Sequence, residues 1–176
     1  MISLQTLLTL LNNKYLKQFN TQIVGGFDEP FYKASVNDNP AEIQFSHDYI
    51  RSALHELSHW CVAGEERRKL DDYGYWYAVD GRSQQQQDEF FKLEIKPQAI
   101  EWAFSIVCGV KFEASVDNLN NAVNGIEKFK ENLEIQMYEH VKNGFSKRVS
   151  EIIKLIADNQ AIDSYMDYIS QKIQEM

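Results

Sequence analysis

The sequence contains few of the residues that interrupt or cross-link a chain. It has three prolines, two cysteines and four histidines among 176 residues, with no internal repeat and no low-complexity linker. The cysteines, Cys61 and Cys108, lie in apolar helical surroundings, which favours buried free thiols over a disulfide and suits a reducing compartment. The length suffices for one sizeable core, so we expect a single domain over residues 1–176.

Long apolar runs and an excess of basic residues are absent as well. No apolar run approaches the length of a membrane helix, and residues 1–8 lack the basic start and cleavage site of a signal peptide. The net charge of -8, from 18 basic and 26 acidic side chains, argues against attraction to nucleic acid or anionic lipid. There is no glycine-rich phosphate loop and no Ser-His-Asp order. We therefore expect a cytoplasmic protein without a direct nucleic-acid or membrane partner.

The apolar pattern predicts an α+β fold. Helical spacing indicates a helix over about residues 48–63, and Ser83 with Gln86 forms a capping-box pattern for the next helix. Pro97 favours the start of a further helix that runs to Cys108. Strand candidates cover residues 22–24, 42–46 and 110–115, and residues 73–77 form a strand-like aromatic segment. The expected architecture is one compact domain with a small mixed sheet, a metal-ligand helix and a helical C-terminal third.

The strongest chemical signal is His55-Glu56-Leu57-Ser58-His59, inside the helix predicted over residues 48–63. Two imidazoles four residues apart lie on one face of a helix, so both can bind the same metal ion. Zinc with Glu56 as general base would support hydrolysis. Ferrous iron on two histidines and a carboxylate would support oxygen chemistry. The motif alone leaves both interpretations open.

A third ligand has to come from another segment, and Glu94 and Glu101 are the candidates. If a helix begins at Pro97, Glu94 lies just before that helix and Glu101 lies inside it. Zinc peptidases usually take their third carboxylate from a helix, which favours Glu101. An acid near a helix N-terminus is also favourable without any metal, so the residues themselves leave the choice open.

Three segments with these residues resemble the elongation factor P hydroxylase family. They are residues 55–64 (HELSHWCVAG), 74–82 (GYWYAVDGR) and 94–99 (EIKPQA). Asp28-Glu29-Pro30 and Asp117-Asn118-Leu119 also resemble the family's pattern. The likeness covers roughly residues 20 to 120, in order and spacing.

The resemblance implies hydroxylation of the β-lysylated lysine of elongation factor P, dependent on O2 and on a non-haem Fe(II) centre. The implied ligands are His55, His59 and Glu94, so the resemblance places Glu94 above Glu101. Zinc or another divalent metal could occupy the same donors. The implied fold is similar to that of a metal-dependent endoribonuclease. The competing interpretation remains a zinc metallohydrolase related to peptidases with the same motif.

The remaining site expectations concern the substrate. Glu56 is the expected catalytic residue, either orienting a ligand or binding the cationic lysine. Tyr75, Trp76 and Tyr77 are expected to bind the substrate by walling the pocket and facing its alkyl chain or ammonium group. Packing of this aromatic segment in the core is the alternative. Gln98 is expected to bind the substrate as well. The alternative is that it holds the third ligand, Glu94.

Overall fold

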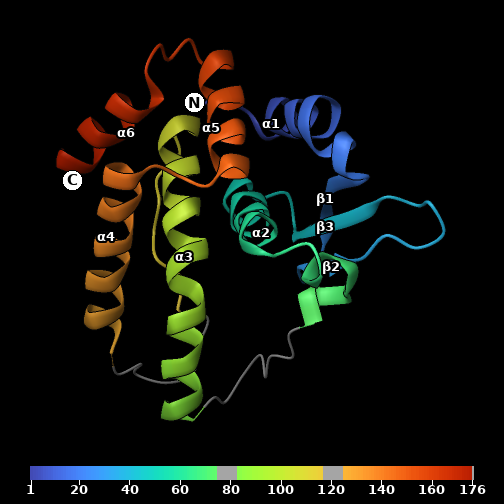
Figure 1. Ribbon diagram of the computed structural model, residues 1–176, viewed down its shortest axis with the longest axis horizontal. Helices are drawn as coiled ribbons and strands as arrows, with labels where there is room; N and C mark the ends of the chain where they lie inside the picture. The colour runs from blue at the N-terminus through green and yellow to red at the C-terminus, as the bar shows by residue number, and fades with distance from the viewer. Residues whose placement is uncertain (75–82, 117–124, 176) are drawn as a thin grey trace.

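A three-stranded sheet lies beside a group of helices in the computed structural model, which describes residues 1–74, 83–116 and 125–175 (Figure 1). The strands are β1 (Thr21–Phe27), β2 (Phe31–Lys33) and β3 (Ala41–Ser46). The α-helices of these residues are α1 (Leu4–Leu10), α2 (Ile50–Val62), α3 (Gln84–Cys108), α4 (Ile126–Asn143), α5 (Lys147–Asn159) and α6 (Tyr165–Gln174). Short helical turns are η1 (Leu11–Tyr15), η2 (Leu16–Phe19), η3 (Arg67–Lys69) and η4 (Asp71–Gly74).

The sheet is small and mixed, as predicted. Its order is β1-β3-β2, with β1 parallel and β2 antiparallel to β3. In β3, Ala41, Ile43 and Phe45 are buried and the residues between them are half-buried, the alternation of a strand with one covered face. β1 is longer than predicted, since it continues past residue 24 to Phe27. At Gly25 within it, the Phe45 ring leaves no room for a Cβ atom, so only glycine fits there.

Helix α2 packs against both the sheet and α3 and carries the two motif histidines. Its core stripe is buried, while His55 and His59 are half-buried beside it. The carbonyls at its C-terminal end accept from the guanidinium of Arg148 on α5, at 3.0 Å for Trp60 and 3.2 Å for Ala63. The same guanidinium lies 4.7 Å from the Trp60 ring centroid. A cation therefore satisfies carbonyls that the helix leaves without donors.

The long helix α3 corrects one prediction. The capping box of Ser83 and Gln86 is present as expected. However, no second helix begins at Pro97, which lies inside a helix that runs from Gln84 to Cys108. A proline inside a helix costs about 3 kcal/mol, since it removes one amide donor and crowds the preceding turn. The turns after Pro97 are buried among other helices, and that burial outweighs the local cost.

The strand predicted over residues 110–115 is also wrong, because this segment is irregular. The segment packs against α3 and not against a strand. The Phe112 ring, for example, stacks on Trp102 of α3 with centroids 5.4 Å apart. At the start of the aromatic segment, Tyr73 and Gly74 belong to the helical turn η4 and not to a strand. Tyr75, Trp76 and Tyr77 lie outside the described residues.

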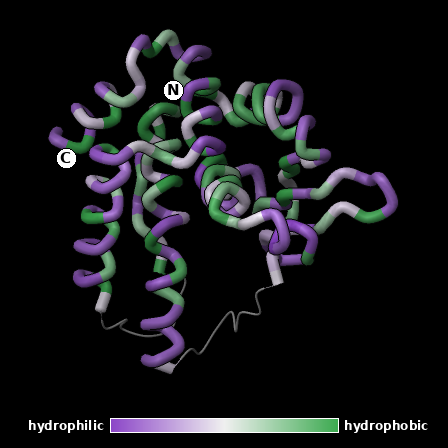
Figure 2. Tube along the Cα trace, viewed as in Figure 1, coloured by the Kyte–Doolittle hydropathy of each residue, from purple (hydrophilic) through white to green (hydrophobic). Residues whose placement is uncertain are grey.

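The largest core cluster draws on buried residues from Ile2 to Ile173. Figure 2 shows hydrophobic residues on the inner sides of the helices and in the sheet, with hydrophilic residues on the outer turns. Cys61 and Cys108 are free and buried, as the sequence suggested. Among the helices of the described residues, none is both long and apolar enough to cross a membrane.

Substitution of Arg148 by methionine should destabilise the protein by about 2–3 kcal/mol, because it leaves the end of α2 without its charged donor. Urea unfolding monitored by circular dichroism measures this difference. Lys147→Met is the matched control, since the neighbouring Lys147 side chain is 89% exposed and lies 3.9 Å from Glu151. That control should stay within about 0.5 kcal/mol of the parent. Equal unfolding midpoints for the two variants would contradict the capping role.

Candidate metal centre

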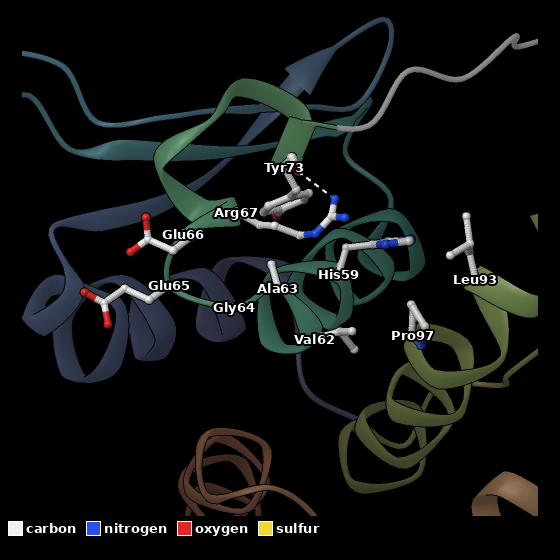
Figure 3. Close-up of a pocket in the computed structure, with 10 residues that line it drawn as sticks. All are labelled: His59, Val62, Ala63, Gly64, Glu65, Glu66, Arg67, Tyr73, Leu93 and Pro97. Carbon is white, nitrogen blue, oxygen red and sulfur yellow. Dashed lines mark hydrogen bonds between the residues drawn. The ribbon is translucent and has the colours of Figure 1, made fainter.

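A pocket of about 520 Å³ opens beside His59, between the end of α2, η3, η4 and α3 (Figure 3). Its apolar wall includes Val62, Leu93 and Pro97. The polar residues that line it are Glu65, Glu66, Arg67 and Tyr73. Figure 3 shows the Glu65 and Glu66 carboxylates pointing away from His59. Figure 3 also shows the Arg67 guanidinium near His59, where it donates to the Tyr73 carbonyl. The pocket therefore has an apolar wall and a cation near the histidine, and acidic residues at its other end.

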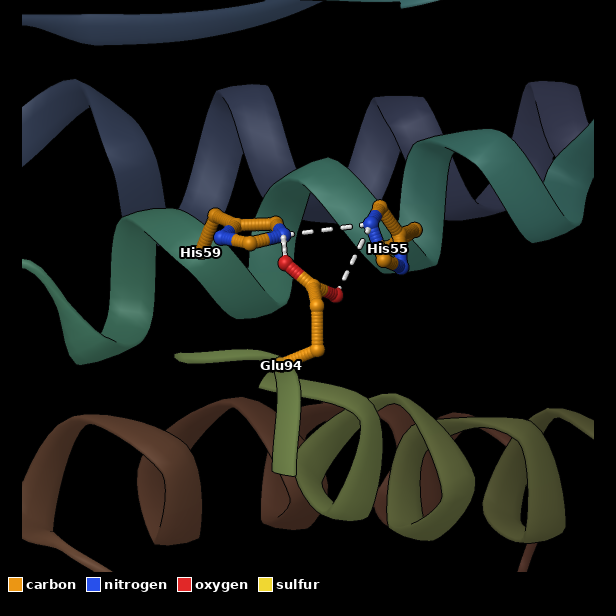
Figure 4. A group of neighbouring side chains, drawn as sticks. All are labelled: His55, His59 and Glu94. Atoms are coloured by element: carbon orange, nitrogen blue, oxygen red, sulfur yellow. Dashed lines mark hydrogen bonds and ion pairs between the residues drawn. The ribbon is translucent and has the colours of Figure 1, made fainter. Parts of the chain in front are cut away.

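His59 also belongs to a group with His55 and Glu94, in which α2 supplies both histidines and α3 the carboxylate (Figure 4). The Nε2 atoms of the two histidines are 3.1 Å apart. The Glu94 carboxylate lies 3.2 Å from Nε2 of His59 and 3.7 Å from Nε2 of His55. Three potential ligand atoms thus converge at one point, at the edge of the pocket.

These separations fit a metal ion. Ligand atoms about 2.0–2.2 Å from one ion lie about 3.0–3.5 Å from each other, close to the three distances observed. Two imidazole nitrogens facing each other at 3.1 Å also need a proton or a cation between them. Imidazole and carboxylate ligands suit iron, zinc and related divalent metals. The residues present therefore fit the metal site that the sequence predicts.

Glu101 lies on the other side of His55. Its carboxylate is buried and 2.8 Å from Nδ1 of His55. An ionised carboxylate only accepts, so Nδ1 donates and the Nε2 lone pair of His55 is left facing His59 and Glu94. Glu94 and Glu101 are seven residues apart in one continuous helix, and both face α2. The structure thus brings Glu94 into the possible metal-binding group, whereas Glu101 holds the His55 ring from its other side.

Gln98 holds the Glu94 carboxylate from behind. It is fully buried, and its Nε2 donates to Glu94 at 3.1 Å and to the carbonyl of Ser115 at 2.8 Å. Its Oε1 accepts from the Ser115 amide at 2.9 Å. Both ends of the Gln98 amide are therefore engaged, and through Gln98 the irregular segment after α3 helps to hold the Glu94 carboxylate.

The charges of the site favour a cation. Burial lowers the pKa of His55, but the hydrogen bond that it donates to Glu101 and the charges of the surrounding carboxylates raise it to about 10. Burial raises the pKa of Glu94, yet the two histidines and Gln98 lower it to about 2. Without a metal, the carboxylates thus hold a proton on His55 at neutral pH. A divalent ion replaces that proton when it binds.

Glu56 and Tyr73 complete the surroundings. Glu56 is half-buried on α2. Burial raises the pKa of Tyr73, and the charge of Glu56 adds to that rise and, more weakly, to the rise at His55. The sequence pattern did not indicate that Tyr73 lines the pocket, since it was grouped with the aromatic strand candidate. The pocket wall from Val62, Leu93 and Pro97 was missed too, because apolar helical residues carry no chemical signal in a sequence.

The chain is similar to known proteins over most of its length. The sequence model of the elongation factor P hydroxylase family matches residues 10–167. The chain is 40% identical over 154 residues to the elongation factor P lysine hydroxylase of Haemophilus influenzae. That alignment covers 87% of this chain and 86% of the relative. This chain therefore belongs to the elongation factor P hydroxylase family.

Proposed function

We propose that this protein hydroxylates the lysine of elongation factor P that carries a β-lysyl group. Family membership and the name of the Haemophilus influenzae relative support the substrate and the reaction. The observation that carries the proposal is the group of His55, His59 and Glu94 at the edge of a pocket. A side chain that enters the pocket reaches the group at His59.

We infer that the resident metal is Fe(II), although zinc or another divalent ion can bind the same donors. Ferrous iron held by two histidines and one carboxylate keeps coordination positions open and can activate O2 for attack on an unactivated carbon. The chain's own contribution is to fix the three ligands. Glu101 orients His55, and Gln98 orients Glu94.

The pocket residues would bind the lysyl chain. The apolar wall suits the methylene groups, whereas the charge of Glu56 favours a cationic substrate near His55 and Tyr73. Substrate contact by Gln98 stays a prediction, and the hydrogen bonds that it makes support the holding of Glu94 instead. Tyr75, Trp76 and Tyr77 stay predicted substrate contacts, and Glu56 the predicted catalytic residue.

The proposed substrate also bears on partners and location. A translation factor is a cytoplasmic protein, so we infer that this enzyme acts in the cytoplasm. The net charge of -8 supports recognition of a protein substrate without direct binding of nucleic acid. We propose no membrane partner.

An oxygen-labelling assay tests the reaction. Anaerobically purified, iron-loaded protein is mixed with β-lysylated elongation factor P and O2 labelled with heavy oxygen, and the modified peptide is analysed by mass spectrometry. We expect one labelled oxygen atom on the lysine. A zinc-loaded sample run in labelled water tests the hydrolase alternative. If the peptide carried oxygen from water and none from O2, or if it were cleaved, the hydroxylase proposal would be overturned in favour of hydrolysis.

Removal of a ligand should abolish metal binding. We expect His59→Ala and Glu94→Gln each to weaken the affinity for Fe(II) by more than about a hundredfold, because each takes one donor from the group. Anaerobic titration with Fe(II), or with Co(II) as a spectroscopic probe, measures the affinity. Glu89→Gln is the matched control, since Glu89 is an exposed residue of the same helix. Unchanged affinity in Glu94→Gln would refute its assignment as ligand.

Glu101→Gln should behave differently from Glu94→Gln. The amide still reaches His55 but no longer supplies a charge, so we expect about 10- to 100-fold weaker metal binding with full occupancy at saturating metal. The Co(II) spectrum at saturation should keep the parent's coordination number. If Glu101→Gln lost the metal at all concentrations while Glu94→Gln retained it, Glu101 would be the ligand.

A further inference from the structure

A positively charged side chain lines the pocket beside the group of possible metal ligands. Arg67 begins the short turn η3, and both Arg67 and His59 line the pocket. The Arg67 guanidinium lies near His59, and its Nη1 donates to the Tyr73 carbonyl at 3.1 Å (Figure 3). A positive charge beside a cation-binding group disfavours the metal ion, so the metal site itself does not account for the place of Arg67.

Contacts that start at the sheet hold the Arg67 guanidinium in place. The Tyr73 ring stacks on Tyr32 of β2 with centroids 4.2 Å apart, and Asp72 accepts from the Tyr32 amide at 2.9 Å. These contacts fix the turn that carries the Tyr73 carbonyl, and this carbonyl anchors Arg67. A guanidinium carries five N–H donors in a planar fork, so it can donate to more than one acceptor at once. Arg67 is therefore a positioned donor in the wall of the pocket.

The two forms of the substrate lysine differ at the group that a guanidinium distinguishes best. An unmodified lysine ends in an ammonium group, which a guanidinium repels. In the β-lysylated lysine the same nitrogen belongs to a neutral amide, whose carbonyl oxygen accepts a hydrogen bond. This oxygen is only a few bonds from the carbons of the lysine chain. A chain carbon can therefore lie at His59 while the carbonyl lies at Arg67, and the acidic end of the pocket at Glu65 and Glu66 suits the ammonium groups of the β-lysyl part.

We propose that Arg67 selects the β-lysylated lysine by donating a hydrogen bond to the carbonyl oxygen of the amide that links the β-lysyl group to the lysine. The inference rests on the proposed function and adds a specificity residue to it. The same guanidinium disfavours the ammonium group of the unmodified lysine, so selection combines an attraction with a repulsion. The apolar wall of Val62, Leu93 and Pro97 contacts the methylene groups of either form and does not distinguish them.

Binding without turnover tests this proposal. The affinity of the iron-loaded protein is measured by anaerobic calorimetry for elongation factor P with the lysine unmodified, acetylated or β-lysylated. Acetylation supplies the amide carbonyl without the ammonium groups of β-lysine. In Arg67→Met we expect the preference for each amide form over the unmodified form to fall about 10- to 100-fold, the effect of losing one charged hydrogen bond. The fall should be similar for both amide forms, because both carry the carbonyl.

Lys69→Met is the matched control. Lys69 lies on the same turn and pairs with Glu66 at 2.6 Å, but it does not belong to the described residues that line the pocket. The substitution removes the same charge from η3, so the preference should stay within about twofold of the parent if the contact in the pocket matters and not the net charge of the turn. Unfolding midpoints of both variants are measured beside the affinities, since Arg67 also holds the Tyr73 carbonyl.

The outcomes separate the two proposals. A parent enzyme that hydroxylates its substrate, with a preference that Arg67→Met leaves unchanged, overturns the role of Arg67 and leaves the hydroxylase function standing. An iron-loaded parent that adds no oxygen to the substrate overturns the hydroxylase function itself. A lower unfolding midpoint in Arg67→Met, with equal loss of affinity for all three forms, assigns Arg67 a structural role and overturns the inference. A loss confined to the β-lysylated form overturns the contact with the amide carbonyl.

Discussion

The hydrogen bond between His55 and Glu101 is the interaction on which the site depends. It joins α2 to α3 at 2.8 Å, and it determines which nitrogen of His55 keeps a lone pair. With Nδ1 donating to Glu101, Nε2 of His55 is directed to His59 and Glu94. A rotation of the ring would turn this nitrogen away from the group. The packing of the two helices therefore determines how the His55 ring is oriented, because this hydrogen bond forms only when α2 and α3 lie side by side.

This arrangement requires a polar layer inside the protein. Glu94, Gln98 and Glu101 recur at intervals of four and three residues along α3, so they share the face that meets α2. All three are buried, and each has a hydrogen-bond or ion-pair partner. Buried carboxylates are costly unless paired, so the layer stabilises the protein less than an apolar layer would. It holds two carboxylates against the two histidines, an arrangement that suits a cation.

The sequence predicted the local features of this site better than its long-range ones. The helix with His55 and His59, the strand ending at Ser46 and the cap at Ser83 follow from periodicity and side-chain chemistry within a few residues. The continuation of α3 through Pro97 does not, because it depends on burial by distant helices. Glu94 and Glu101 both face α2, so the sequence could not separate their roles without the resemblance. The similarity to a metal-dependent endoribonuclease fold stays a prediction.

Pro97 connects the main fold error with the function. A break there would have removed Glu94 from the helix, whereas the continuous helix holds Glu94 and Glu101 in one register against α2. The proline still removes one amide donor, and it does so on the side of α3 that lines the pocket. The lost donor therefore falls within one turn of Glu94, the residue proposed as the third ligand. The residue least suited to a helix thus lies where the helix faces the proposed substrate.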